Sequence, residues 1–158
     1  MSKPNRGKDF ENVIKQAFEK IDDVSIDRLH DQTSGFKGSR NICDFIVYKY
    51  PTQIYLECKC CYGNTLNFHN ITDNQWDGLY EKSQIAGVEA GVIIWFIDHD
   101  ITVYIPIEEL FELKGAGYKS VNVKDLPIVS EIIDGTKKRV FFDYDMNRLL
   151  YGFFSCRR

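Results

Sequence analysis

Hydrophobic residues recur at helical spacing near the start of the chain. Six of them fall on one face of a predicted helix: Phe10, Val13, Ile14, Ala17, Phe18 and Ile21. At about 100° per residue, Glu11 lies on the flank of this apolar face, whereas Glu19 projects from the opposite side. The pattern predicts an amphipathic helix that carries one acidic side chain at the rim of its packing face.

Shorter apolar runs further along the chain predict strands and two more helices. We expect strands at 24–29, 41–48, 53–60, 91–97 and 101–107. Thr72 is predicted to cap a helix over 73–85 that turns Trp76, Leu79 and Tyr80 inward, and a short helix is expected over 108–113. A hairpin at Asp134-Gly135 and a short helix near Met146 complete the prediction. The order of elements indicates one mixed α/β domain over residues 1–158.

The two middle strands form a predicted hairpin with its turn at Tyr50-Pro51. This register places Asp44 directly opposite Glu57, with Cβ atoms roughly 4.5–5.5 Å apart. Lys59 projects from the same face, since it lies two residues beyond Glu57. The opposite face is predicted to be apolar and to carry Cys43, Phe45, Val47, Ile54, Leu56 and Cys58.

Opposed carboxylates repel each other, so a pair such as Asp44 and Glu57 needs a compensating charge. A hard divalent cation held by oxygen ligands is suited to that role, and Lys59 could stabilise charge on a phosphate. An acid pair, a metal and an ammonium group on a rigid hairpin are the parts required to hydrolyse a phosphodiester. The alternative interpretation is an ordinary cross-strand surface cluster in partial charge balance, and the spacing by itself leaves both open.

Asp44 followed by Glu57-Cys58-Lys59 resembles the PD-(D/E)xK nuclease motif. Three further segments are similar to the RecU-type Holliday junction resolvases: the opening 5–11, the segment 70–75 with Gln75 at its end, and the apolar strand 91–97. The resemblance runs from about residue 5 to residue 127. It implies an α/β restriction-endonuclease-like fold, a mixed β-sheet flanked by helices.

The resemblance also implies roles for particular residues. Asp44 and Glu57 would bind Mg²⁺, for which Mn²⁺ could substitute, and Glu11 would assist at the metal directly or through water. Lys59 would position or activate the attacking water, and Gln75 would orient the catalytic groups. A homodimer acting on a four-way DNA junction is the implied assembly.

Two departures from the family pattern stand out. Cys43 occupies the position of the motif's proline. The loop 32–40 lies near the place where RecU-type enzymes project a stalk into the junction, and it is short here. The second departure bears on junction selectivity more than on chemistry.

Composition changes this picture little. The chain is 44% hydrophobic and 27% charged, has no apolar run long enough for a membrane span and starts without a secretion signal, so we expect a cytoplasmic protein without a membrane partner. The net charge of −3 is unusual for a DNA-binding protein, although basic residues cluster at 3–8, 37–40, 137–139 and 157–158. Five cysteines match neither a disulfide framework nor zinc-like spacing, and we interpret them as small apolar fillers.

Three functions fit the sequence. The preferred one is a magnesium-dependent endonuclease that resolves Holliday junctions in DNA recombination and repair. Another DNA nuclease of the same fold, of restriction, nicking or repair type, is the second. A non-catalytic DNA-binding module is the third, and the intact set of Asp44, Glu57 and Lys59 disfavours it.

Overall fold

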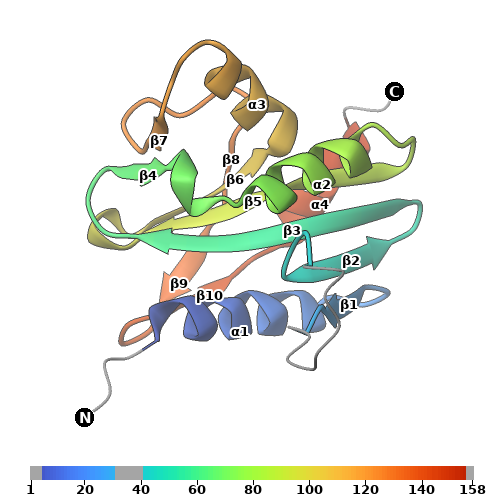
Figure 1. The fold of residues 1–158 in the computed structure, drawn as a ribbon. Helices are drawn as coiled ribbons and strands as arrows, with labels where there is room; N and C mark the ends of the chain where they lie inside the picture. Colours follow the sequence, from blue (N-terminus) through green and yellow to red (C-terminus); the bar gives the residue numbers. More distant parts are fainter. Residues whose placement is uncertain (1–4, 31–40, 156–158) are drawn as a thin grey trace.

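A six-stranded mixed sheet forms the centre of the molecule (Figure 1). The computed structural model describes residues 5–30 and 41–155. Neighbouring strands are antiparallel except for the third and fourth, which are parallel. In spatial order the strands are β1 (Ser25–Arg28), β2 (Phe45–Lys49), β3 (Thr52–Cys61), β5 (Val88–Phe96), β6 (Ile101–Pro106) and β8 (Glu131–Ile132).

Two small antiparallel sheets lie beside the main one. The first pairs β4 (Thr65–Asn67) with β7 (Ser120–Asn122), and the second pairs β9 (Gly135–Lys137) with β10 (Phe142–Tyr144). Single 3-10 turns follow β4 at Phe68–Asn70 and β5 at Ile97–His99. The β4–β7 sheet and its turn thus stand next to the start of α2, where the candidate site lies (Figure 1).

Helices cover both faces of the main sheet. Side chains of α1 (Arg6–Glu19) and α4 (Asn147–Ser155) share one hydrophobic core with β2 and β3. Side chains of α2 (Asp73–Ser83) and α3 (Ile107–Gly115) share the other with β5 and β6. The predicted α/β class, a mixed sheet between helices, is confirmed. None of the helices in the described part of the chain is long and apolar enough to cross a membrane.

The first helix matches its predicted pattern. Phe10, Ile14, Ala17 and Phe18 are buried, and the side chain of Asn5 caps the helix by accepting a hydrogen bond from the Lys8 N–H at 3.2 Å. An amphipathic helix of this kind is stabilised mainly by burial of its apolar face. The predicted 24–29 strand and the 91–97 and 101–107 hairpin are also present, as β1 and as β5 with β6.

The hairpin register is confirmed, with Phe45 opposite Leu56 and Val47 opposite Ile54. The prediction for Cys43 was wrong, because this side chain packs in the core beneath α2 and not with Phe45 on the α1 side. Strand β2 begins only at Phe45, so the alternation of side chains does not extend back to Cys43. The thiol of Cys43 instead lies 3.3 Å from the Phe45 carbonyl oxygen.

Two other predictions need correction, and one falls outside the described residues. Tyr80 is 38% exposed and packs against Phe111, with the rings tilted and their centroids 4.4 Å apart, so it covers the edge of the core without entering it. The Asp134-Gly135 pair joins β8 to β9, and the hairpin turn lies instead between β9 and β10. The predicted helix near Met146 is present as α4. The loop 32–40 lies outside the described residues.

Candidate active site

Glu57 is a buried carboxyl group on the face of β3 that is turned toward α2. Its neighbours in the strand, Leu56 and Cys58, point into the core on the α1 side, so alternation directs Glu57 the other way. Only 3% of the residue is exposed to solvent. A buried carboxyl group is costly unless it is paired, bonded or protonated, so its partners define the chemistry of the site.

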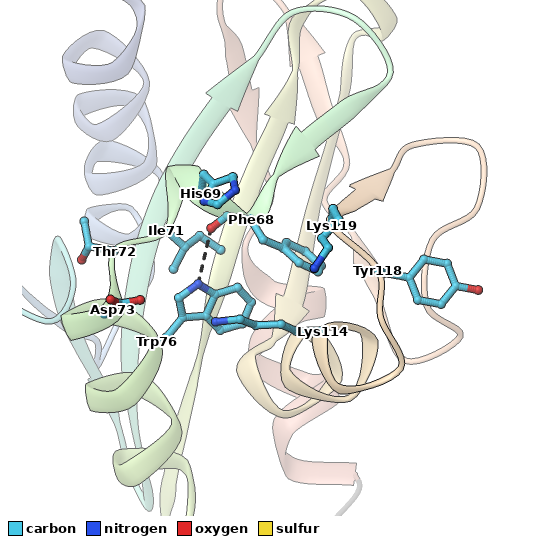
Figure 2. A pocket seen from close by; sticks show the side chains of 9 residues that line it. All are labelled: Phe68, His69, Ile71, Thr72, Asp73, Trp76, Lys114, Tyr118 and Lys119. Atoms are coloured by element: carbon cyan, nitrogen blue, oxygen red, sulfur yellow. Dashed lines mark hydrogen bonds between the residues drawn. The ribbon is translucent and has the colours of Figure 1, made fainter.

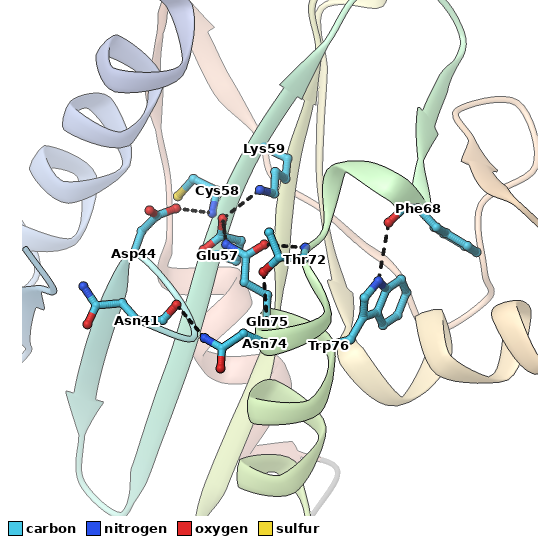
Figure 3. A network of polar contacts seen from close by, with 10 residues as sticks. All are labelled: Asn41, Asp44, Glu57, Cys58, Lys59, Phe68, Thr72, Asn74, Gln75 and Trp76. Atoms are coloured by element: carbon cyan, nitrogen blue, oxygen red, sulfur yellow. Dashed lines mark hydrogen bonds and ion pairs between the residues drawn. The ribbon is translucent and has the colours of Figure 1, made fainter. Parts of the chain in front are cut away.

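Asp44 meets Glu57 at the end of the β2–β3 ladder. The ladder stops at the Phe45–Leu56 pair, and the N–H of Asp44 donates to the Leu56 carbonyl oxygen at 3.1 Å. Its carboxylate reaches across to β3, where Oδ2 accepts the N–H of Cys58 at 2.8 Å (Figure 3). This bond fixes the Asp44 carboxylate beside that of Glu57, as the hairpin register predicts.

The two oxygens of Glu57 have different surroundings. Oε1 accepts hydrogen bonds from Lys59 Nζ at 3.0 Å and from Gln75 Nε2 at 2.8 Å (Figure 3). Oε2 is buried and receives no hydrogen bond from any nitrogen or hydroxyl donor among the described residues. The Asp44 carboxyl is close enough to Glu57 for the two acids to share a proton.

This environment raises the pKa of both acids. Burial is the largest cause for Glu57, the negative charge of Asp44 adds to it, and together they raise the pKa from 4.5 to about 8 against the opposing charge of Lys59. Burial also raises the pKa of Asp44, while the Cys58 N–H and Lys59 act in the opposite direction. Because the two groups titrate together, the pair retains about one proton at neutral pH.

Gln75 links the second helix to the acid pair. Its Oε1 accepts the backbone N–H of Thr72 at 3.0 Å, and the Thr72 hydroxyl accepts the N–H of Gln75 at 3.2 Å, which together form a capping box at the start of α2. Its Nε2 donates to Glu57. Because the capping box binds Oε1 of Gln75, its Nε2 is turned toward the Glu57 carboxylate. The start of α2 therefore sets the orientation of this donor.

Replacement of Gln75 is expected to slow the enzyme without inactivating it. Gln75→Ala removes the donor to Glu57 and one half of the cap, and groups that support metal ligands typically affect activity by about 10- to 100-fold. We expect a rate loss in that range, measured as single-turnover cleavage of a four-way junction. Asp77→Ala, an exposed position on the same helix, is the matched control and should cleave at the wild-type rate. Equal rates for Gln75→Ala and Asp77→Ala would remove Gln75 from the site.

Glu11 lies near the acid pair but is held by another residue. Its Oε2 accepts Arg28 Nη1 at 2.9 Å, and Arg28 Nη2 donates to the side chain of Asn12 at 2.6 Å. Burial raises the pKa of Glu11 and the charge of Asp44 raises it further, against the effect of Arg28. The structure therefore brings Asp44, Glu57, Lys59 and Gln75 into direct contact, while Glu11 forms the rim beside them.

Arg28 is a residue of this site that the sequence alone does not reveal. It lies opposite Phe45 in the β1–β2 ladder, and its guanidinium is 5.0 Å from the centre of the Phe45 ring. It supplies positive charge beside Glu11 and Asp44. The pairing of β1 with β2 could have identified it, because this pairing places Arg28 opposite Phe45, the residue that follows Asp44.

The acid pair suits a hard divalent cation. The Oε2 atom of Glu57 is buried without a nitrogen or hydroxyl donor, and a second carboxylate faces the same group, which is the oxygen-rich arrangement that Mg²⁺ and similar ions prefer. Within residues 5–30 and 41–155, no group of three or more His, Cys, Asp and Glu side chains is arranged to hold a metal. A cation held by these two carboxylates would therefore take its remaining ligands from water, substrate or backbone oxygen, as is common for Mg²⁺.

Comparison with known proteins finds a match among solved structures. No protein-family model matches the chain. No curated protein matches it either. Among solved structures, it is similar to Hjc, a Holliday junction resolvase from the archaeal hyperthermophile Archaeoglobus fulgidus, with a TM-score of 0.48, 18% sequence identity and coverage of 65% of this chain and 78% of that chain. The assignment of the site consequently depends on the residues of this chain and on their geometry.

Proposed function

We propose that this protein is a magnesium-dependent endodeoxyribonuclease that hydrolyses phosphodiester bonds in four-way DNA junctions. One observation carries the proposal: the buried carboxyl of Glu57 faces Asp44, has one oxygen without a nitrogen or hydroxyl donor among the described residues, and has Lys59 at 3.0 Å on its other oxygen. An acid pair next to an ammonium group is what hydrolysis of a phosphate diester requires. The resemblance of the 5–11 and 70–75 segments to RecU-type resolvases supports the junction as substrate.

Each residue has a separate task in this mechanism. Asp44 and Glu57 would hold Mg²⁺, with Mn²⁺ as a substitute, and the bound cation would polarise the phosphate and lower the pKa of an attacking water. The Lys59 side chain is 20% exposed, so its Nζ is available to a phosphate oxygen or to the attacking water while it remains bonded to Glu57. Gln75 keeps the Glu57 carboxylate oriented, and Glu11 would contact the cation through water from the rim.

Incubation with a mobile four-way junction and with a linear duplex, with and without Mg²⁺, tests this function. Paired symmetric nicks in the junction that depend on Mg²⁺ are the expected result. Cleavage of the duplex or of flaps alone would indicate a nuclease of restriction, nicking or repair type. Binding without cleavage under all conditions would indicate a non-catalytic DNA-binding module.

A homodimer is expected, because resolution requires two cuts at symmetric points and each chain has one site. The aromatic residues near the C-terminus are candidates for a dimer interface, and their environments differ. Tyr144 is buried in the core, Phe141 and Phe142 pack against it, and Tyr151 is 71% exposed on α4. Tyr151 is therefore the described member of this set that is available to a partner.

Sedimentation at micromolar concentration without DNA should give a particle of about 37 kDa, twice the 18.4 kDa chain. The same experiment with junction DNA should give two chains per junction. A monomer in both experiments would contradict the resolvase assignment and favour a nicking or repair nuclease.

A further inference from the structure

A pocket of about 430 Å³ opens beside the first turn of α2 (Figure 2). Its volume lies within the range of about 300–1,000 Å³ that is typical of small-molecule sites. Phe68 and Trp76 provide an apolar lining, with their rings edge to face and 5.3 Å apart, and the Trp76 indole N–H donates to the Phe68 carbonyl oxygen at 3.4 Å. The catalytic role proposed above uses none of these aromatic groups.

One side of the pocket is positively charged. Lys114 and Lys119 both line it, and the Lys114 ammonium lies 4.5 Å from the centre of the Trp76 ring. Neither lysine forms an ion pair with a carboxylate of the described residues. The one acidic group of the lining, Asp73, lies on the opposite side from Lys119 (Figure 2). An anionic group would therefore bind at the lysine side.

An exposed aromatic ring stands at the outer rim of the pocket, beyond Lys119, and projects away from Phe68 and Trp76 (Figure 2). Tyr118 is 54% exposed and follows α3, between Lys114 and Lys119 along the chain. Lysine charge next to a free aromatic face is the combination that binds a phosphate together with a stacked base. A base can offer its face to such a ring only where it is not stacked within a duplex.

Hydrogen bonds link the pocket to the proposed active site through Thr72. This residue lines the pocket, its backbone N–H donates to Gln75, and Gln75 donates in turn to Glu57. A DNA strand whose scissile phosphate lies at Glu57 and Lys59 would thus pass the mouth of the pocket with a neighbouring nucleotide.

We propose that this pocket binds one unpaired nucleotide of the DNA substrate, with its phosphate at Lys114 and Lys119 and its base against Tyr118. The inference rests on the proposed endonuclease function and adds a subsite to it. Through this subsite, DNA with unpaired nucleotides at a branch point or an end is bound more tightly than continuous duplex.

Fluorescence anisotropy in EDTA tests the proposal without cleavage, with a short single-stranded oligonucleotide, a four-way junction and a duplex as probes. For Tyr118→Ala we expect about tenfold weaker binding of the single strand and little change for the duplex. For the double variant Lys114→Ala/Lys119→Ala, the slope of log affinity against log salt should fall by about two. The matched control is Lys15→Ala/Lys20→Ala, on α1 and at its C-cap, which removes the same charge from the opposite side of the sheet.

Unchanged single-strand binding by Tyr118→Ala, or an equal loss for single strand and duplex, would overturn the proposal. An equal change of salt slope in the control variant would overturn it as well. Cleavage of the junction by the wild type in Mg²⁺ is measured separately. Absence of cleavage together with pocket-dependent binding would reject the proposed nuclease function and support the nucleotide site, so the two failures are distinguishable.

Discussion

Glu57→Gln, Asp44→Asn and Lys59→Ala are each expected to lower the single-turnover rate of junction cleavage by about 10³-fold or more. The first two changes remove a negative charge from the proposed cation site while keeping the shape of the side chain. The third removes the ammonium that lies 3.0 Å from Glu57 Oε1. Removal of one preorganised charge-stabilising group typically costs about 10²–10³ in rate, and loss of a metal ligand also removes the chemistry of the bound ion.

Binding and chemistry should separate in these variants. We expect junction affinity within a few-fold of wild type, since affinity for DNA comes mainly from contacts between basic residues and phosphates. Glu19→Gln is the matched control: it neutralises an exposed acid on α1 that bonds only Lys15 among the described residues. Full cleavage by Glu57→Gln, or an equal loss in Glu19→Gln, would contradict the assignment of the site.

The central hairpin is the part of the site that the sequence predicts best. Alternation of apolar residues in β2 and β3 permits one register that buries Phe45, Val47, Ile54 and Leu56 together, and a shift by one residue would turn the apolar set of one strand to the opposite face. That register carries Asp44 to Glu57. Local pattern and core packing agree here, which is why a prediction from a short stretch of sequence is confirmed.

Alternation fails as a guide where a strand ends. Cys43 would share the face of Phe45 if β2 continued, but the ladder stops at Phe45 and the chain turns so that Cys43 packs beneath α2. The point at which pairing stops depends on the whole sheet. A sequence pattern confined to two strands does not contain that information.

Contacts between elements that are distant in the sequence account for the other features of the site that the sequence does not predict. Arg28 reaches Glu11 because β1 pairs with β2 and α1 lies across them, and no local spacing relates residues 11 and 28. Gln75 is different, because Thr72 and Gln75 carry the T-x-x-Q signature of a capping box. That signature fixes the local geometry of the helix start. The contact with Glu57 also requires that α2, in the connection from β3 to the parallel strand β5, packs over the sheet.

The metal-free protein is expected to lose stability as the pH rises from about 4.5 to about 8. In the folded state the pKa of Glu57 is raised to about 8, chiefly by burial and then by Asp44. Between these pH values the folded protein holds a proton that the unfolded chain has released. The contribution of Glu57 to stability is therefore complete below about pH 4.5 and is lost as the pH rises to about 8. At 1.36 kcal/mol per pKa unit, the loss should amount to a few kcal/mol of unfolding free energy, measured by urea denaturation in EDTA across this range.

Mg²⁺ should reverse this loss, because it replaces the shared proton between Asp44 and Glu57. Binding to the ionised pair releases about one proton below pH 8, so the apparent Mg²⁺ affinity should rise about tenfold per pH unit between pH 6 and 8. The melting temperature should then increase with Mg²⁺ at pH 8 more than at pH 6. Glu57→Gln should lose both the pH slope and the Mg²⁺ effect, whereas Glu19→Gln should keep both. A Mg²⁺ effect that is the same at both pH values, or that persists in Glu57→Gln, would place the cation elsewhere than at this acid pair.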